Sequence, residues 1–116
     1  KHNKIAWVSY AGLKSSSFDF LARKYMKKGV GPVFTFSVKK GFSGKKIISN
    51  VNIFSHVANV GDTRSLILHP ASTTHNQLTE DQKKAAGSGP EVIRLSIGLE
   101  HADDLIEDLD NSLKNI

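Results

Sequence analysis

The sequence predicts an α+β domain in which helices are packed on one face of a mostly antiparallel sheet. Short apolar segments with the two-residue period of strands alternate with segments whose apolar residues follow the helical period. Several connections between successive segments are too short for the crossover that parallel strands require. The length of 116 residues is that of one ordinary domain. We therefore expect a single domain with one core over residues 1–116.

Five segments are predicted strands, because they are short, rich in β-branched and aromatic residues, and bounded by turn-forming residues. In the clearest of them, Phe34, Phe36 and Val38 share one face. Pro70 ends the fourth. The predicted strands are residues 5–10, 32–38, 53–58, 65–69 and 91–97.

Three helices are predicted before residue 90. The first follows three serines at 15–17 that can cap it, and it ends at Gly29. Its expected buried stripe comprises Phe18, Leu21, Ala22, Tyr25 and Met26. A short second helix is expected at 47–52. The third begins at Thr79, which forms a capping box with Gln82, and ends near Gly87.

The tail of the chain is predicted to be an amphipathic helix. Its expected buried stripe is Leu105, Ile106, Leu109 and Leu113. Its acidic residues are expected to face water, and they are Asp103, Asp104, Glu107, Asp108 and Asp110. The early acids favour the positive end of the helix dipole.

The net charge of +5 is unevenly distributed. Residues 1–46 hold eleven of the sixteen Lys and Arg with Asp19 as the only acid, whereas residues 100–110 hold six of the eleven acids. A basic half can bind nucleic acid through nonspecific attraction. No recognition motif accompanies it, so solvated faces of opposite charge are the simpler interpretation, and we expect no nucleic-acid partner. A basic nucleic-acid-binding module and a small interaction domain remain the alternatives.

Composition excludes several kinds of site. The chain has no cysteine, which removes disulfides, thiolate metal sites and cysteine nucleophiles, and which fits a reducing cytoplasm. No apolar run approaches the roughly 20 residues of a membrane helix, so no membrane partner is expected. The chain begins at Lys1 without an initiator methionine or signal segment, and we interpret it as a fragment of a longer protein.

Three groups of residues look like a metal site, a catalytic triad and a phosphate-binding loop, but each is better explained as ordinary structure. His69 and His75 lack an evident third ligand, so hydrogen-bonded anchors are expected rather than a metal site. Ser65, His69 and Asp62 contain the residue types of a hydrolase triad, but such types fall together by chance. The glycine-containing loop at 41–46 lacks the Walker spacing.

Arg94 is the strongest candidate for a binding residue. In the strand at 91–97 the isoleucine and leucine side chains at odd-numbered positions belong under the helices. Arg94 points with Val92 and Ser96 toward the uncovered face. An arginine held there by a stiff strand suits bidentate recognition of a carboxylate. Alternation alone fits an ordinary exposed or ion-paired arginine as well.

Three stretches of sequence carry a resemblance to a known family. They are ANVGDTRSL at 58–66, HPASTTH at 69–75 with QLT at 77–79, and RLSIGLE at 94–100. In this order and spacing they resemble the C-terminal third of the cystathionine-γ-synthase-like pyridoxal-phosphate (PLP) enzymes. Within that group, the O-acetylhomoserine sulfhydrylases look closest. The resemblance implies the C-terminal domain of a fold-type I PLP enzyme, with a larger PLP-binding domain upstream.

The resemblance also implies roles for particular residues. Arg94 would pair with the α-carboxylate of the amino-acid substrate, and the backbone of Asn59 and Val60 would help to hold that carboxylate. Thr74 would line the active site near the cofactor. The Schiff-base lysine and most phosphate-binding residues would lie in the upstream domain. We therefore expect no catalytic residue here, PLP held by the upstream domain, and no activity of this chain alone.

The resemblance implies a reaction for the full-length enzyme. It would be a transferase of methionine and cysteine biosynthesis that replaces the γ-acetoxy group of O-acetylhomoserine with sulfide or a thiol. It would assemble as a homotetramer. Two turns depart from the family pattern, one at 10–13 and one at 39–41. They leave cystathionine γ-synthase and the γ- and β-lyases open as alternatives.

Overall fold

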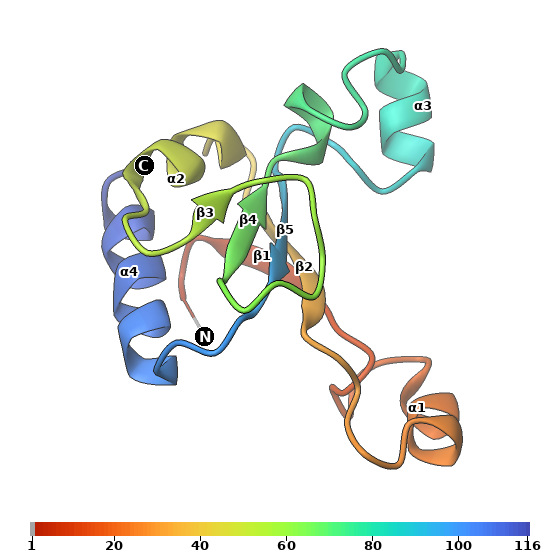
Figure 1. Ribbon diagram of the computed structural model, residues 1–116. Coiled ribbons are helices and arrows are strands. Elements are labelled where there is room, and N and C mark those ends of the chain that lie inside the picture. The colour runs from red at the N-terminus through yellow and green to blue at the C-terminus, as the bar shows by residue number, and fades with distance from the viewer. Residues whose placement is uncertain (1) are drawn as a thin grey trace.

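The centre of the computed structural model is a five-stranded sheet (Figure 1). The structure describes residues 2–116, with Lys84 described by its backbone alone. Neighbouring strands are antiparallel except β3 and β4, which run parallel. The α+β class with a mostly antiparallel sheet is therefore confirmed. In spatial order the strands are β1 (Ile5–Ser9), β2 (Val33–Val38), β5 (Val92–Ser96), β4 (Leu66–Leu68) and β3 (Ser55–His56).

Two helices, α2 (Gly44–Asn50) and α4 (Ala102–Lys114), lie together on one side of this sheet (Figure 1). The Ser112 hydroxyl of α4 donates to the Ile47 carbonyl of α2 over 2.8 Å, which joins the two helices. Burial of apolar side chains between helices and sheet supplies the main stabilisation of such a layer. The core comprises Phe36, Val38, Ile47, Phe54, Ile67, Ile93, Leu95, Leu105 and Leu113.

Strand β5 alternates as its sequence predicts. Ile93 and Leu95 are fully buried in the core beneath the helices, where they pair across the strands with Phe36 and Phe34 of β2. Because successive side chains of a strand point to opposite faces, Arg94 lies on the other face of the sheet. We call this face, which carries Arg94, the outer face.

Two arms project from the sheet (Figure 1). One carries α1 (Asp19–Tyr25), and the other carries the short 3-10 helix η1 (Pro70–Ser72) and α3 (Glu80–Ala85). The predicted capping box of α3 is confirmed, since the Thr79 amide donates to Gln82 Oε1 over 2.9 Å and the Gln82 amide to Thr79 Oγ1 over 3.3 Å.

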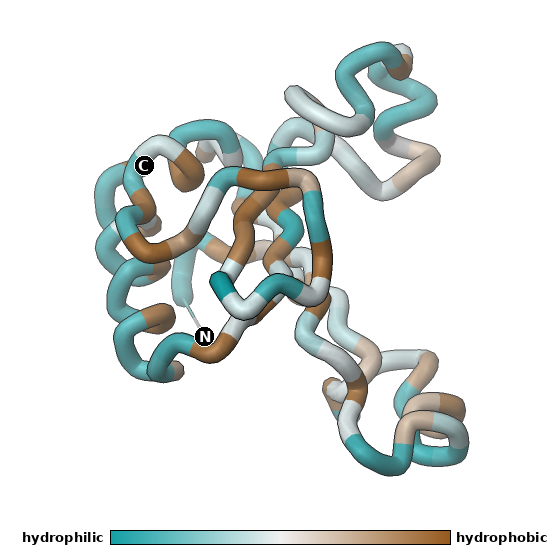
Figure 2. Tube along the Cα trace, in the orientation of Figure 1, coloured by the Kyte–Doolittle hydropathy of each residue, from teal (hydrophilic) through white to brown (hydrophobic). Residues whose placement is uncertain are grey.

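The predicted buried stripe of α1 is wrong. Within it only Ala22 is buried, whereas Phe18 and Tyr25 are 63% and 69% exposed. Figure 2 shows hydrophobic positions on this arm, away from the central sheet. Periodicity identified the helix correctly but could not supply a surface for it to pack against. The expected serine cap is also absent: the N-cap of α1 is Phe18, which provides no side-chain hydrogen bond, and the Ser16 hydroxyl accepts from the Phe18 amide before the helix begins.

Helix α2 begins at Gly44, three residues before the predicted start, and the predicted strand at 53–58 is only two residues long. Tertiary packing explains the helix start. A Cβ atom at Gly44 would lie 3.1 Å from the Pro90 carbonyl oxygen and 3.2 Å from the His69 ring. A glycine therefore lets the first turn of α2 approach residues 69 and 90 closely.

Helix α4 buries a slightly different stripe from the predicted one. Leu105 and Leu113 are buried as expected, but Ile106 is 64% exposed. Asp108, expected to face water, is only 6% exposed. Its carboxylate accepts from the backbone amides of Asn52 and Ile53 at 2.9 Å each, which replaces the water it loses.

The start of β1 is tied to the end of α4. The Lys4 ammonium donates to the carbonyl oxygens of Leu113, Lys114 and Ile116 at 2.7 to 3.1 Å. These carbonyls include ones that a helix leaves without partners at its C-terminus, where a cation is also favoured by the helix dipole. Across residues 2–116, the helices are all too short or too polar to cross a membrane.

Candidate functional site

Arg94 is the central residue of the outer face. It stands in the middle of β5, opposite Thr35 of β2 and Leu68 of β4, and its side chain is half-buried. Its Nη2 donates to the Asn59 carbonyl oxygen over 3.2 Å. Among the described residues no carboxylate forms an ion pair with it. A guanidinium has five N–H donors, so this contact leaves most of them available to a ligand.

The loop between β3 and β4 brings Asn59 and Val60 to Arg94. Figure 1 shows this loop, residues 57–64, reaching from β3 across β4 and β5. The Gly61 amide donates to the Ser96 hydroxyl over 3.2 Å, and Gly61 has a φ of 74°, which glycine adopts without strain. The Asn59 side chain accepts from the Val60 amide over 2.9 Å. The loop is thus fixed against the outer face beside the arginine.

The outer face is less open than the alternation predicts. Ser96 and Leu66, which face each other across β5 and β4, are each 2% exposed. Val92, on the same side of β5, is 5% exposed. Arg94 is the one residue of β5 that retains partial exposure. A ligand would therefore meet the guanidinium rather than the sheet around it.

A second set of contacts fixes the end of the loop, and no local pattern in the sequence predicts these contacts. The Glu100 carboxylate accepts from the Ser65 amide over 2.8 Å and from the Ser65 hydroxyl over 2.7 Å. The Ser65 hydroxyl in turn accepts from the Gly98 amide over 2.9 Å. The two bonds from Ser65 hold the pKa of the Glu100 carboxyl below its ordinary value. Glu100 is therefore a carboxylate over the pH range in which most enzymes work.

Thr74 is not brought into this cluster. It lies on the arm between η1 and α3, where its hydroxyl and the His75 Nδ1 are 2.9 Å apart. Within residues 2–116, no hydrogen bond joins Thr74 to Arg94, Asn59 or Val60. The structure therefore groups three of the four predicted site residues and leaves the fourth on a separate segment.

The histidines of the second motif are hydrogen-bonded, as expected. His69 is 5% exposed, and its two ring nitrogens lie 2.8 Å from the Ser72 hydroxyl and 2.8 Å from the Pro90 carbonyl. These bonds anchor η1 to the segment that enters β5. In the described part of the chain, no group of three or more His, Asp or Glu side chains is placed to hold a metal ion.

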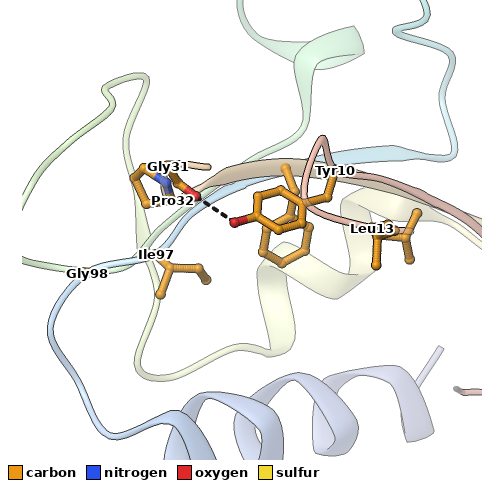
Figure 3. A pocket seen from close by; sticks show the side chains of 8 residues that line it. Tyr10, Leu13, Gly31, Pro32, Ile97 and Gly98 are labelled. Carbon is orange, nitrogen blue, oxygen red and sulfur yellow. Dashed lines mark hydrogen bonds between the residues drawn. The ribbon is translucent and has the colours of Figure 1, made fainter. Parts of the chain in front are cut away.

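An apolar groove lies on the opposite face of the sheet from Arg94. It has a volume of about 580 Å³ and is lined by Val8, Tyr10, Leu13, Gly31, Pro32, Phe34, Ile97 and Gly98. Figure 3 shows the Tyr10 hydroxyl donating to the Gly31 carbonyl, over 3.0 Å. That bond occupies the polar end of the tyrosine. The groove therefore offers apolar contact and no charged group for a substrate carboxylate.

The described lysines do not fit the role of a Schiff-base nucleophile. Such a lysine needs a desolvated pocket that lowers its pKa. The Lys4 ammonium is held by three carbonyl oxygens, and Lys83 is paired with Glu80 over 3.0 Å. The other lysines whose side chains are described are exposed. The site that these residues can form is one for binding and orienting an anionic group.

Comparison with known proteins gives this site a context. Residues 1–114 match the family model described as Cys/Met metabolism PLP-dependent enzyme. The chain is 48% identical over 111 residues to O-acetyl-L-homoserine sulfhydrylase 1 of Thermus thermophilus, covering 95% of this chain and 26% of that protein. It is 43% identical to homocysteine synthase of Schizosaccharomyces pombe, covering 98% and 27%. The chain thus spans about a quarter of the length of these relatives.

Solved structures agree with the sequence comparison. A putative O-acetylhomoserine (thiol)-lyase from Campylobacter jejuni, which carries a pyridoxyl-lysine monophosphate, matches with a TM-score of 0.89 at 41% identity, over 97% of this chain and 27% of that one. Cystathionine gamma-lyase from Lactobacillus plantarum in complex with L-serine matches with a TM-score of 0.91 at 27% identity, over 99% and 30%. The chain belongs to the Cys/Met metabolism family of PLP-dependent enzymes.

Proposed function

We propose that this chain is the C-terminal, substrate-carboxylate-binding part of a PLP-dependent transferase of methionine and cysteine biosynthesis. The full-length protein would replace the γ-acetoxy group of O-acetylhomoserine with sulfide or a thiol. This reaction is supported by the similarity to O-acetyl-L-homoserine sulfhydrylase 1 and to homocysteine synthase. PLP would be held by a larger upstream domain, because the described lysines are either exposed or already bound to carbonyl or carboxylate oxygens.

The main support for the proposal is the set of contacts that the Arg94 guanidinium makes and lacks. Its guanidinium is fixed by a strand, has one donor on the Asn59 carbonyl, and pairs with no carboxylate among the described residues. A buried or half-buried cation without a counter-charge is costly, and a ligand carboxylate would offset that cost. Asn59 and Val60 lie on the loop that this cation contacts, so their backbone would complete the carboxylate site.

In the reaction, Arg94 would act by orientation. PLP supplies an electron sink for the bonds of the substrate Cα when it is bound. The guanidinium holds the α-carboxylate, and so fixes which bond at Cα is presented for cleavage. The two-pronged geometry of arginine defines the plane of the carboxylate as well as its position, which a lysine could not do. Thr74, on the segment between η1 and α3, would line the active site near the cofactor.

The experiment compares Arg94→Ala with the unmodified full-length enzyme. Loss of a charged partner of this kind costs about 2–5 kcal/mol, so KM for O-acetylhomoserine should rise at least about thirtyfold. The matched control is Arg23→Ala, at an exposed arginine on α1 that pairs with Asp19. An unchanged KM in Arg94→Ala would reject the carboxylate role.

A γ-lyase reaction is the second candidate. The chain is 41% identical to L-methionine gamma-lyase of Fusobacterium nucleatum over its full length, covering 29% of that protein. The same carboxylate site would serve either reaction, because Arg94 acts on a group that both substrates share. Supplying the full-length enzyme with O-acetylhomoserine and sulfide, or with methionine alone, separates the two by the product formed.

We also propose that the full-length enzyme works in the cytoplasm and assembles as a homotetramer. The absence of cysteine is consistent with a reducing compartment. Light scattering on the purified full-length protein would give the mass of the assembly. A monomeric mass would reject the oligomer.

A further inference from the structure

We infer that Glu100 is a positioning residue for the carboxylate site. Its carboxylate, acting through Ser65, holds the loop at 57–64 at the distance from β5 at which the Asn59 carbonyl meets Arg94. This inference rests on the proposed function of Arg94. Glu100 and Ser65 are not among the residues proposed to contact the substrate, and they would act by supporting the loop that is.

The loop is attached to β5 and its extension at four points in register. Arg94 contacts the Asn59 carbonyl, and the Ser96 hydroxyl accepts from the Gly61 amide. Beyond the strand, the Leu99 amide donates to the Thr63 carbonyl over 2.8 Å. The last point is the pair of bonds from Ser65 to Glu100. The attached loop residues are spaced two apart in the chain, so a displacement at Ser65 would be passed on to Thr63, Gly61 and Asn59.

The Glu100 attachment is the strongest of the four by chemistry. Its acceptor is a carboxylate that receives two donors from one residue, and hydrogen bonds to charged groups are about twice as strong as neutral ones. Ser65 has no solvent exposure, so water cannot replace these bonds at its side. The negative charge of the nearby Asp62 carboxylate raises the pKa of Glu100. The hydrogen bonds from Ser65 lower it by more, so the pKa of Glu100 remains below its ordinary value.

Gly98 makes this close attachment possible. A Cβ atom there would collide with the Thr63 carbonyl oxygen and would lie 2.6 Å from the Ser65 amide nitrogen. Without a side chain, the Gly98 amide reaches the Ser65 hydroxyl at 2.9 Å. The RLSIGLE motif therefore contains the substrate-facing arginine, the close-packed glycine and the anchoring glutamate as one unit.

The test uses Glu100→Gln and Ser65→Ala in the full-length enzyme, with Glu107→Gln as control. Glu107 is an exposed glutamate on α4 that, in the described chain, makes no hydrogen bond or ion pair through its side chain. Three quantities are measured: KM and kcat for O-acetylhomoserine, the midpoint of thermal unfolding, and amide hydrogen exchange of residues 57–65. The exchange measurement reports on the loop without depending on turnover.

For both Glu100→Gln and Ser65→Ala we expect faster exchange of the Gly61 amide and a rise in KM of about tenfold, with kcat changed less than KM. The control should change neither. In the Arg94→Ala background, Glu100→Gln should add a smaller rise in KM than it causes alone, because only the backbone of Asn59 and Val60 then remains to be displaced from the carboxylate.

Unchanged loop exchange, or an unchanged KM in an enzyme whose loop exchange is faster, overturns the inference. An equal additional rise of KM in the Arg94→Ala background overturns it as well, since the glutamate would then act independently of the arginine. The proposed function fails separately, if Arg94→Ala leaves KM unchanged. A fall of the thermal midpoint with unaltered KM identifies a structural role alone and also rejects positioning.

Discussion

The Arg94 guanidinium and the Asn59 carbonyl, 35 positions apart in the chain, meet through a hydrogen bond of 3.2 Å. The donor is a side chain fixed on the central part of the sheet, and the acceptor is backbone on a loop. The bond therefore depends on where the loop runs, and hardly on which side chain occupies position 59. This separation of side chain and backbone can be tested by substitution.

Asn59→Ala should leave the carboxylate site largely intact. The carbonyl that meets Arg94 remains, and the change removes only the neutral bond from the Val60 amide to the Asn59 side chain. A bond of that kind contributes about 0.5–1.5 kcal/mol, so KM for O-acetylhomoserine should rise by less than about tenfold. Steady-state kinetics beside Arg94→Ala, which should show at least about a thirtyfold rise, makes the comparison. Equal effects of the two substitutions would mean that the asparagine side chain itself binds substrate.

Gly98→Ala should destabilise the protein and disturb the loop. The new methyl group would meet backbone atoms of Thr63, Arg64 and Ser65, which cannot turn aside as a side chain does. Overpacking of this kind costs about 1–3 kcal/mol, measurable as a lower midpoint in urea. Gly89→Ala is the matched control, since its nearest neighbour is a Glu91 side-chain oxygen at 3.3 Å. A urea midpoint for Gly98→Ala equal to that of the unmodified protein would show that the segment at Gly98 can move away from residues 63–65 without loss of stability.

The Glu100 attachment should persist to acidic pH. Its pKa in the folded chain is lowered by the bonds from Ser65, so the glutamate contributes stability that is fully present above its unfolded-state pKa, about 4.3. That contribution is lost as pH falls through the lowered, folded-state pKa. Exchange protection of the Ser65 and Gly98 amides, followed from pH 7 downward, should hold until below the ordinary glutamate range. In Glu100→Gln the same protection should be weaker and independent of pH across that range.

Asp108→Asn should destabilise the packing of α4. Both carboxylate oxygens accept from the amides of Asn52 and Ile53, so an amide side chain would turn one acceptor into a donor facing other donors. Leaving a buried donor unsatisfied costs about 1–3 kcal/mol. Urea unfolding measures the loss, and Glu107→Gln, one residue away on an exposed position, controls for the charge. An unaltered free energy of unfolding would contradict a structural role for Asp108.

The parts of the fold that follow a simple period could be predicted from the sequence. The alternation of Phe34, Phe36 and Val38, and of the residues around Arg94, placed two central strands and the correct side for the arginine. The capping box at Thr79 predicted where α3 begins. In each case the signal lies within a few residues of the element that it specifies.

The errors arose where distant residues decide the outcome. The apolar period of α1 predicted a buried stripe, but a helix buries its stripe only if another element lies against it. Asp108 had the polarity of a surface residue, and its burial depends on two amides more than 50 residues away. The same applies to Glu100 and Ser65, whose pairing has no local periodicity. The candidate arginine was therefore predictable, whereas the contacts that position its loop were not.

The regular attachment of the loop limits how this part of the chain can vary in length. Asn59, Gly61, Thr63 and Ser65 each face a fixed partner on β5 or just beyond it. Inserting or deleting a single residue among them would shift later contacts by one position, as a slipped register does between strands. Between Asn59 and Ser65, replacement of a residue is therefore compatible with this fold, whereas insertion or deletion is not.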